Sequence, residues 1–142
     1  MEPFAAGIVP YTIIYGKYYF LLGLETSNNK WSGFVGGSEP GEIPRETAIR
    51  EFHEETKLVF ENYPILLENE PTFIDRTPTG KKVYLWFMEM EYNENINSLF
   101  KTKRLGGRQF NEKSELRYFS LSEIVRSKNI LYQLKEVILR TF

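Results

Sequence analysis

GGSEPGEIPRETAIREFHEETKL, residues 36–58, is the stretch from which the rest of the chain can be placed. It opens with two glycines and a Pro-Gly turn, and it then enters a helix that we expect to run from Pro44 to about Thr56. Pro44 suits the first turn of a helix, because its missing N–H would have no partner there. Ala48 and Phe52 lie on one side of this helix and are suited to pack against a core.

Three carboxylates share a narrow stripe on the same helix. At about 100° per residue, Glu54 lies roughly 60° to one side of Glu51, and Glu55 lies roughly 40° to the other side. Like charges at these spacings repel each other. A hard divalent cation such as Mg²⁺ or Mn²⁺ would remove that repulsion, since such ions prefer oxygen ligands. From these residues alone, a solvated acidic face is the simpler interpretation.

The spacing of the wider motif changes that balance. Five residues separate Gly36 from Glu42, and seven more precede REFHEETKL at residues 50–58. This pattern resembles the signature of the Nudix hydrolases, in which a glycine, a glutamate and an acidic helix have these separations. Lys57 departs from it, because the family usually has a left-handed glycine there, and predicts a strained or differently shaped helix end. Many members also have one more residue in the loop, so that Gly36 rather than Gly37 is the motif glycine.

The resemblance implies roles for the acids and for one arginine. Glu54 and Glu55 would be metal ligands, Glu51 a ligand or the general base, and the backbone carbonyl of Gly36 a further ligand. Arg50 would pair with a carboxylate and fix its position. The cofactor implied is Mg²⁺ (or Mn²⁺), which would grip the phosphates of the substrate.

The general base differs among family members, since some use a glutamate of the helix and others an acid of a later loop. In this chain the later candidates are Glu112 and Glu115, and we favour Glu115. Glu42 would orient the loop before the helix. Gly36 and Gly37 would let the substrate phosphates approach the backbone, because glycine has no Cβ.

A basic segment, KTKRLGGR at residues 101–108, follows much later in the chain. A solvated loop is the simpler interpretation of such a segment. If the segment closes over the cleft beside the acidic helix, its cations would bind extra phosphates of the substrate. Lys103, Arg104 and Arg108 are therefore our candidate substrate-binding residues.

The composition is that of a globular protein. The chain has 142 residues, of which 42% are hydrophobic and 15% aromatic, and its formal net charge is -1. We expect one domain over residues 1–142, with no general attraction to nucleic acid or to membranes. The sequence has no cysteine, and we see no signal peptide and no apolar run as long as a membrane span. These features favour a cytoplasmic protein.

The remaining segments predict strands around the acidic helix. Their order indicates an α/β (α+β) protein, and the resemblance implies the α/β/α sandwich of the Nudix fold, with a mixed β-sheet between helices. Pro10 argues for an edge position or a bulge in the first strand, whereas the long apolar run at 82–92 argues for a central strand. The expected strands are 5–15, 18–25, 31–35, 71–75, 82–92 and 116–119, the expected later helices are 121–125 and 129–140, and 93–112 is expected to be irregular.

These observations predict a divalent-metal-dependent hydrolase of a pyrophosphate bond in a nucleoside diphosphate linked to another group. Its partner would be a small phosphorylated molecule, most simply a nucleotide. Within the same family, decapping of mRNA and hydrolysis of diphosphoinositol polyphosphates are alternatives. Two alternatives come from other classes: a Nudix-like domain that senses a nucleotide without cleaving it, and a structural domain whose acidic helix is incidental.

Overall fold

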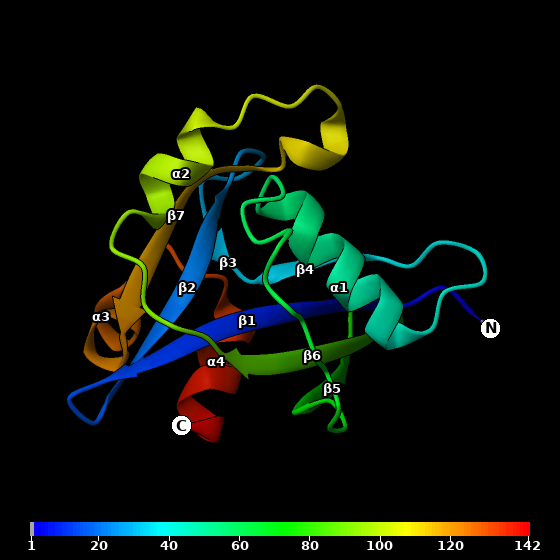
Figure 1. Ribbon diagram of the computed structural model, residues 1–142. Helices are drawn as coiled ribbons and strands as arrows, with labels where there is room; N and C mark the ends of the chain where they lie inside the picture. The colour runs from blue at the N-terminus through cyan, green and yellow to red at the C-terminus, as the bar shows by residue number, and fades with distance from the viewer. Residues whose placement is uncertain (1) are drawn as a thin grey trace.

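The computed structural model describes residues 2–142, and a seven-stranded mixed sheet forms its centre (Figure 1). The strand order is β3-β2-β1-β6-β5, with β4 paired to β1 and β7 paired to β2. β1 is parallel to β6, and the other pairs are antiparallel. The elements are β1 (Ala5–Ile14), β2 (Lys17–Glu25), β3 (Trp31–Ser32), β4 (Phe34–Gly37), α1 (Pro44–Glu55), β5 (Phe73–Arg76), β6 (Lys82–Glu89), α2 (Ile96–Thr102), the 3-10 helix η1 (Arg108–Phe110), β7 (Lys113–Ser120), α3 (Leu121–Arg126) and α4 (Tyr132–Thr141).

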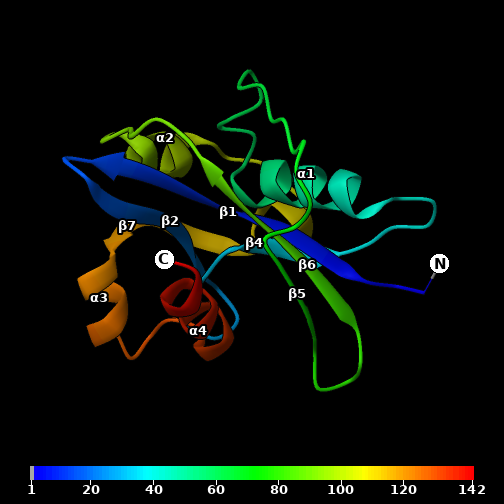
Figure 2. The same cartoon turned by 90° about the horizontal axis from the view of Figure 1, so that it is seen from below.

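Helices cover both faces of the sheet, with α1 and α2 on one side and α3 and α4 on the other (Figure 2). Each face has its own hydrophobic core. Phe52 of α1 and Phe100 of α2 are fully buried in the first core, and Ile124 of α3 and Ile138 of α4 are fully buried in the second. The expected α/β/α arrangement around a mixed sheet is therefore confirmed.

The expected edge position of Pro10 is wrong, because β1 lies at the centre of the sheet. On one side β1 pairs with β4 over residues 5–8 and with β2 over residues 11–14, so Val9 and Pro10 have no partner there. Pro10 thus falls where β1 changes partner, and its missing N–H removes no ladder bond on that side. β6 is flanked by β1 and β5, as its long apolar run predicted.

The segment 93–112 is not irregular throughout, because it contains α2 and η1. Ile96 and Phe100, spaced i and i+4, are both buried and dock α2 on the sheet. The strand expected at 31–35 is divided at Gly33 into β3 and β4. The expected cap of α3 is confirmed, since the Glu123 N–H donates to the Ser120 hydroxyl at 3.1 Å. Among the helices within residues 2–142, none combines the length and apolar character that a membrane crossing requires.

Candidate metal and active site

α1 lies against β4 and β1, and this packing sets the direction of its acids (Figure 1). Phe52 is fully buried and meets the Phe34 ring edge-on, with the ring centroids 5.6 Å apart. Glu51 and Glu55 lie on either side of this anchor along the helix. Both glutamates are buried, with 8% and 2% of their surface exposed.

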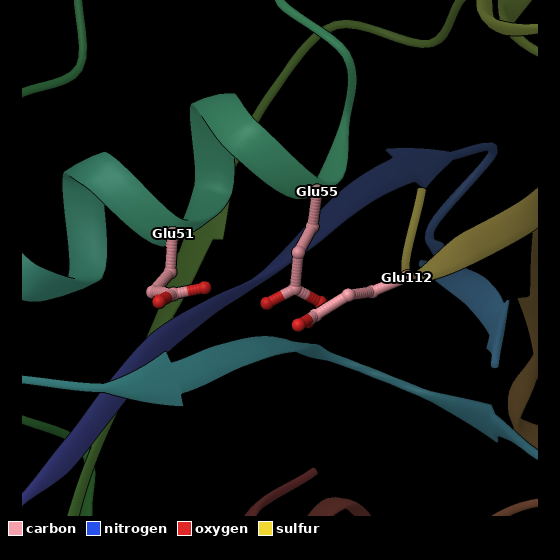
Figure 3. A group of neighbouring side chains, drawn as sticks. All are labelled: Glu51, Glu55 and Glu112. Carbon is pink, nitrogen blue, oxygen red and sulfur yellow. The ribbon is translucent and has the colours of Figure 1, made fainter. Parts of the chain in front are cut away.

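A third acid joins them from a different part of the chain. Glu112, in the loop before β7, brings its carboxylate to those of Glu51 and Glu55, and one oxygen from each residue lies within 4.8 Å of the others. Figure 3 shows the three side chains converging between α1, β4 and the start of β7. We call Glu51, Glu55 and Glu112 the acid group. Such a set of oxygen donors suits a divalent cation.

Burial sets the electrostatic character of two members of the acid group, Glu51 and Glu55. Burial raises the pKa of Glu51, and it raises the pKa of Glu55 well above the ordinary value although the Lys113 ammonium opposes the shift. Among residues 2–142, Oε2 of Glu55 is one of two buried side-chain atoms without a hydrogen-bond partner. Leaving a carboxylate oxygen buried and unpaired is costly, and a proton or a bound cation would lower that cost.

Gly36 is required by the acid group itself. A Cβ placed at Gly36 would overlap the carboxyl group of Glu51. The motif glycine therefore makes room for an acid of the helix, in addition to any room it makes for phosphates. Gly37 contributes in another way, because its carbonyl accepts a hydrogen bond of 2.8 Å from Nη2 of Arg50.

Arg50 connects the loop before α1 to the acids of the helix. Its Nε and Nη2 donate to the two carboxylate oxygens of Glu42 at 2.7 and 3.0 Å. Its Nη1 donates to Glu51 at 3.0 Å and to Glu54 at 3.1 Å. The hydrogen bond from Arg50 lowers the pKa of Glu42 to about 2. One guanidinium thus fixes three carboxylates.

Two predicted acids lie outside the acid group. Nη1 of Arg50 donates to Glu54 as well as to Glu51, so Glu54 lies beside Glu51 but is not one of the three converging acids. Glu115 is inside β7, opposite Leu24, and its carboxylate lies 4.0 Å from the ammonium of Lys101. The acid that joins the helix from the later segment is therefore Glu112 and not Glu115. A register shift between β2 and β7 at Leu24 separates the two positions, and sequence spacing does not reveal it.

Lys113 is a member of the site that sequence reasoning missed. Only 2% of its surface is exposed, and its ammonium lies 3.6 Å from Glu55 and 3.7 Å from Glu25. The ammonium also donates to the carbonyl of Gly33 at 3.1 Å. A Cβ at Gly23 would come within 2.7 Å of Cδ of Lys113, so Gly23 makes room for the lysine. These partners lie between 58 positions (Glu55) and 90 positions (Gly23) before Lys113 in sequence, so no local pattern marks them.

Two members of the acid group, Glu55 and Glu112, line a cavity of about 350 Å³, which we call the acid cavity. Its walls include Glu55, Glu112 and Lys113 together with Asn111 and Arg108. Of the three basic candidates, Arg108 therefore reaches the acid cavity. Lys103 and Arg104 line a neighbouring pocket that shares Asn111 with it.

The end of α1 is strained, as Lys57 predicted. Lys57 and Leu58 have φ angles of 52° and 59°, in the left-handed region that costs other residues about 1–2 kcal/mol relative to glycine. The Lys57 N–H donates to the Glu54 carbonyl at 3.1 Å, and the Leu58 N–H donates to the His53 carbonyl at 2.8 Å. These two bonds form the turn that a glycine usually makes at a helix end.

Several solved structures have the same fold as this chain. An Ap4A hydrolase from C. elegans, in a binary complex, has 21% sequence identity over 98% of this chain and 94% of its own, with a TM-score of 0.68. A NUDIX-family hydrolase from Clostridium perfringens has 17% identity over 99% and 96%, with a TM-score of 0.66. The NUDIX domain of Shewanella oneidensis NrtR, solved with ADP ribose, has 15% identity over 99% and 88%, with a TM-score of 0.60. No curated protein sequence matched the chain.

The family itself is shown by sequence. The model of the NUDIX domain matches residues 12–141, and the chain belongs to the NUDIX family. It is accordingly a hydrolase that acts on acid anhydrides in phosphorus-containing substrates.

Proposed function

We propose that this protein hydrolyses a phosphoanhydride bond in a nucleotide-like substrate with the help of Mg²⁺ or Mn²⁺ bound by the acid group. One observation carries the proposal: three carboxylates from two segments converge within 4.8 Å, and one buried oxygen of Glu55 has no protein partner. A hard cation would satisfy that oxygen and remove the repulsion among the acids.

Glu51, Glu55 and Glu112 would hold the metal, with Glu54 and the carbonyl of Gly36 as further proposed ligands. When bound, the ion supplies positive charge against the phosphates and lowers the pKa of a bound water. The fit rests on the donor set, since carboxylate and carbonyl oxygens are the ligands that Mg²⁺ and Mn²⁺ prefer.

Three residues would take further roles in the reaction: Glu112, Arg108 and Arg50. Glu112 is the exposed member of the acid group and lines the cavity, so its carboxylate would either complete the metal site or take a proton from the attacking water. Arg108 would bind phosphate oxygens through paired N–H donors. Arg50 is a positioning residue, because it touches Glu51 and Glu54 and lies outside the lining of the cavity.

A second cavity of about 300 Å³ suits the nucleoside part of the substrate. It shares Glu25 and Val35 with the acid cavity. Phe73, Leu134 and the polar Gln133 are among its other walls. Apolar walls with a few polar groups are typical of sites for small organic molecules. The similar proteins named above, an Ap4A hydrolase and a domain solved with ADP ribose, also handle phosphate-linked nucleosides.

The test is a phosphate- and pyrophosphate-release screen with Mg²⁺ and Mn²⁺. The panel contains nucleoside triphosphates, dinucleoside polyphosphates, nucleotide sugars, ADP-ribose, diphosphoinositol polyphosphates and capped RNA. Cleavage that requires the metal and is lost in Glu55→Gln would support the proposal. Nucleotides that raise the melting temperature without being cleaved would instead indicate a nucleotide sensor.

A further inference from the structure

A pocket beside the acid cavity concentrates positive charge. Its volume is about 690 Å³, and among residues 2–142 no carboxylate contributes to its walls. We call it the basic pocket. It is lined by Lys57, Lys101, Lys103, Arg104, Leu105, Gly106, Asn111 and Ser114. Four of the chain's 18 basic residues thus gather in one place, although the formal net charge of the chain is -1.

The basic pocket adjoins the acid group along two stretches of chain. Lys57 follows Glu55 by two residues, and Ser114 follows Glu112 by two residues. Since consecutive Cα atoms are 3.8 Å apart, each pair of Cα atoms is separated by at most about 7.6 Å. Asn111 lines both cavities. The basic pocket and the acid cavity are therefore neighbours that meet at Asn111.

The cations of this pocket lack the partners that would neutralise them. Within residues 2–142, no carboxylate oxygen lies within 4.0 Å of the charged nitrogens of Lys57, Lys103 or Arg104. Lys101 has one such contact, an exposed pair with Glu115 at 4.0 Å. Four neighbouring cations with so little compensation favour the binding of an anion.

Lys57 adds an independent observation. Its backbone adopts the left-handed conformation that glycine adopts without cost, so a lysine is unfavourable for the backbone there. The Lys57 side chain, which a glycine would lack, lies over the Phe100 ring with its ammonium 4.4 Å from the ring centroid. The same side chain lines the basic pocket. Backbone strain of this kind is often retained where the side chain serves a function.

We propose that the basic pocket binds the phosphates that lie beyond the bond being cleaved. The inference rests on the proposed function, in which the acid group and Arg108 hold the two phosphates of the scissile linkage. Four further cations match at least two further phosphates. The substrate class is therefore one with four or more clustered phosphates, either a linear chain or a polyphosphorylated ring.

A direct binding measurement tests whether the basic pocket binds phosphates, and it does not depend on hydrolysis. Isothermal titration with inorganic tripolyphosphate and with inositol hexakisphosphate, without divalent ions, compares the wild type with Lys101→Gln/Lys103→Gln/Arg104→Gln. We expect the triple variant to bind the preferred probe at least about tenfold more weakly. Because inositol hexakisphosphate carries twice as many phosphates as tripolyphosphate, the comparison uses the ratio of wild-type to triple-variant affinity for each probe. The probe with the larger ratio identifies a linear chain or a ring as the source of the phosphates.

A matched control separates the pocket from net charge. Lys17→Gln/Arg126→Gln/Lys128→Gln removes three exposed cations that do not line the basic pocket, and we expect its affinity to change by less than about twofold. An equal loss in both triple variants, no binding by the wild type, or tighter binding of a short RNA than of either probe would overturn the proposal.

Lys57→Gly gives a result that a structural role for Lys57 would not. It should leave the melting temperature unchanged or raised, since glycine suits the left-handed position, and it should still weaken binding of the probe. A lower melting temperature with unchanged binding would refute the part assigned to Lys57.

The hydrolysis screen then shows which idea fails. The pocket triple variant should lose kcat/KM on tetraphosphate or diphosphoinositol substrates and keep it on ADP-ribose. If no substrate is cleaved but the pocket triple variant binds tripolyphosphate more weakly than the wild type, the proposed reaction is contradicted and the proposed anion site is supported. Cleavage of all substrates with equal efficiency by the wild type and the triple variant would remove the anion site but leave the reaction.

Discussion

Glu55 is the residue on which the acid group depends most, because it is the most buried of the three acids and has an oxygen without a protein partner. Glu55→Gln keeps the shape of the side chain and removes its charge. We expect kcat/KM to fall by at least about 100-fold and Mn²⁺ binding to weaken, while the fold persists. Electron paramagnetic resonance of free Mn²⁺ measures the affinity. Glu115→Gln is the control and should be near normal; similar Mn²⁺ affinities for Glu55→Gln and the wild type would contradict the assignment.

A substitution at Gly36 tests the acid group by changing the space available to Glu51. In Gly36→Ala, the new methyl group would displace the Glu51 carboxyl group, and we expect Mn²⁺ affinity to fall by about tenfold or more. Gly106→Ala is the control, because a Cβ at Gly106 meets nothing within 4 Å. The same titration compares the two variants, and equal affinities would show that Gly36 does not set the position of Glu51.

Sequence spacing could identify Glu51 and Glu55, because both lie on one helix and their separation fixes their relative direction. It could not choose between Glu112 and Glu115, because that choice depends on a register shift between β2 and β7. Lys113 could not be predicted as a site residue from the sequence for a similar reason. A lysine is rarely buried, and nothing near Lys113 in sequence reveals its partners across the sheet.

At the scale of elements, Arg50 connects the glycine loop to α1. Lysine cannot reproduce the paired hydrogen bonds of a guanidinium, so Arg50→Lys should lower the free energy of unfolding by about 1–3 kcal/mol. Urea denaturation measures the change. The control is Arg117→Lys, whose pair with Glu123 is exposed and should contribute less than about 1 kcal/mol. Equal small losses in both variants would show that the loop does not depend on Arg50.

Elements with strong local signals were predictable, and those defined by tertiary contacts were not. α1 and the cap of α3 follow from Pro44, Ser120 and Glu123, which act within one turn. α2 was missed, since its seven residues carry only two buried apolar side chains and no side-chain cap. Pro10 misled because its cost depends on which neighbour β1 pairs with at that point.

For the whole molecule, the buried acids predict how metal binding depends on pH. Burial raises the pKa of Glu51 and of Glu55, so both bind a proton at a higher pH than free glutamate does. A metal must displace that proton. Affinity for Mn²⁺ should therefore rise with pH over a range above 4.5, the ordinary value, and weaken as the pH falls through it. Titration at several pH values checks this, and Glu55→Gln should have a shallower dependence; an affinity independent of pH would refute it.

The fold class was predictable because the motif helix and the order of strands agree with each other. Strand pairing and the second core under α3 and α4 depend on contacts between distant segments, which one sequence does not display. The particular substrate depends on cavity walls drawn from several elements, Asn111 and Lys57 among them, and so lies beyond the motif.

Lys113 places an ammonium group that belongs to the chain beside the proposed site for an exchangeable cation. The buried ammonium offsets part of the charge of Glu55 and Glu25 whether or not a metal is present. Chelation by EDTA should therefore abolish hydrolysis but change the melting temperature by less than about 3 °C; cooperative unfolding on chelation would contradict this. The metal-free protein would stay folded but inactive. Binding of the ion would switch hydrolysis on and its loss would switch hydrolysis off, without unfolding and refolding.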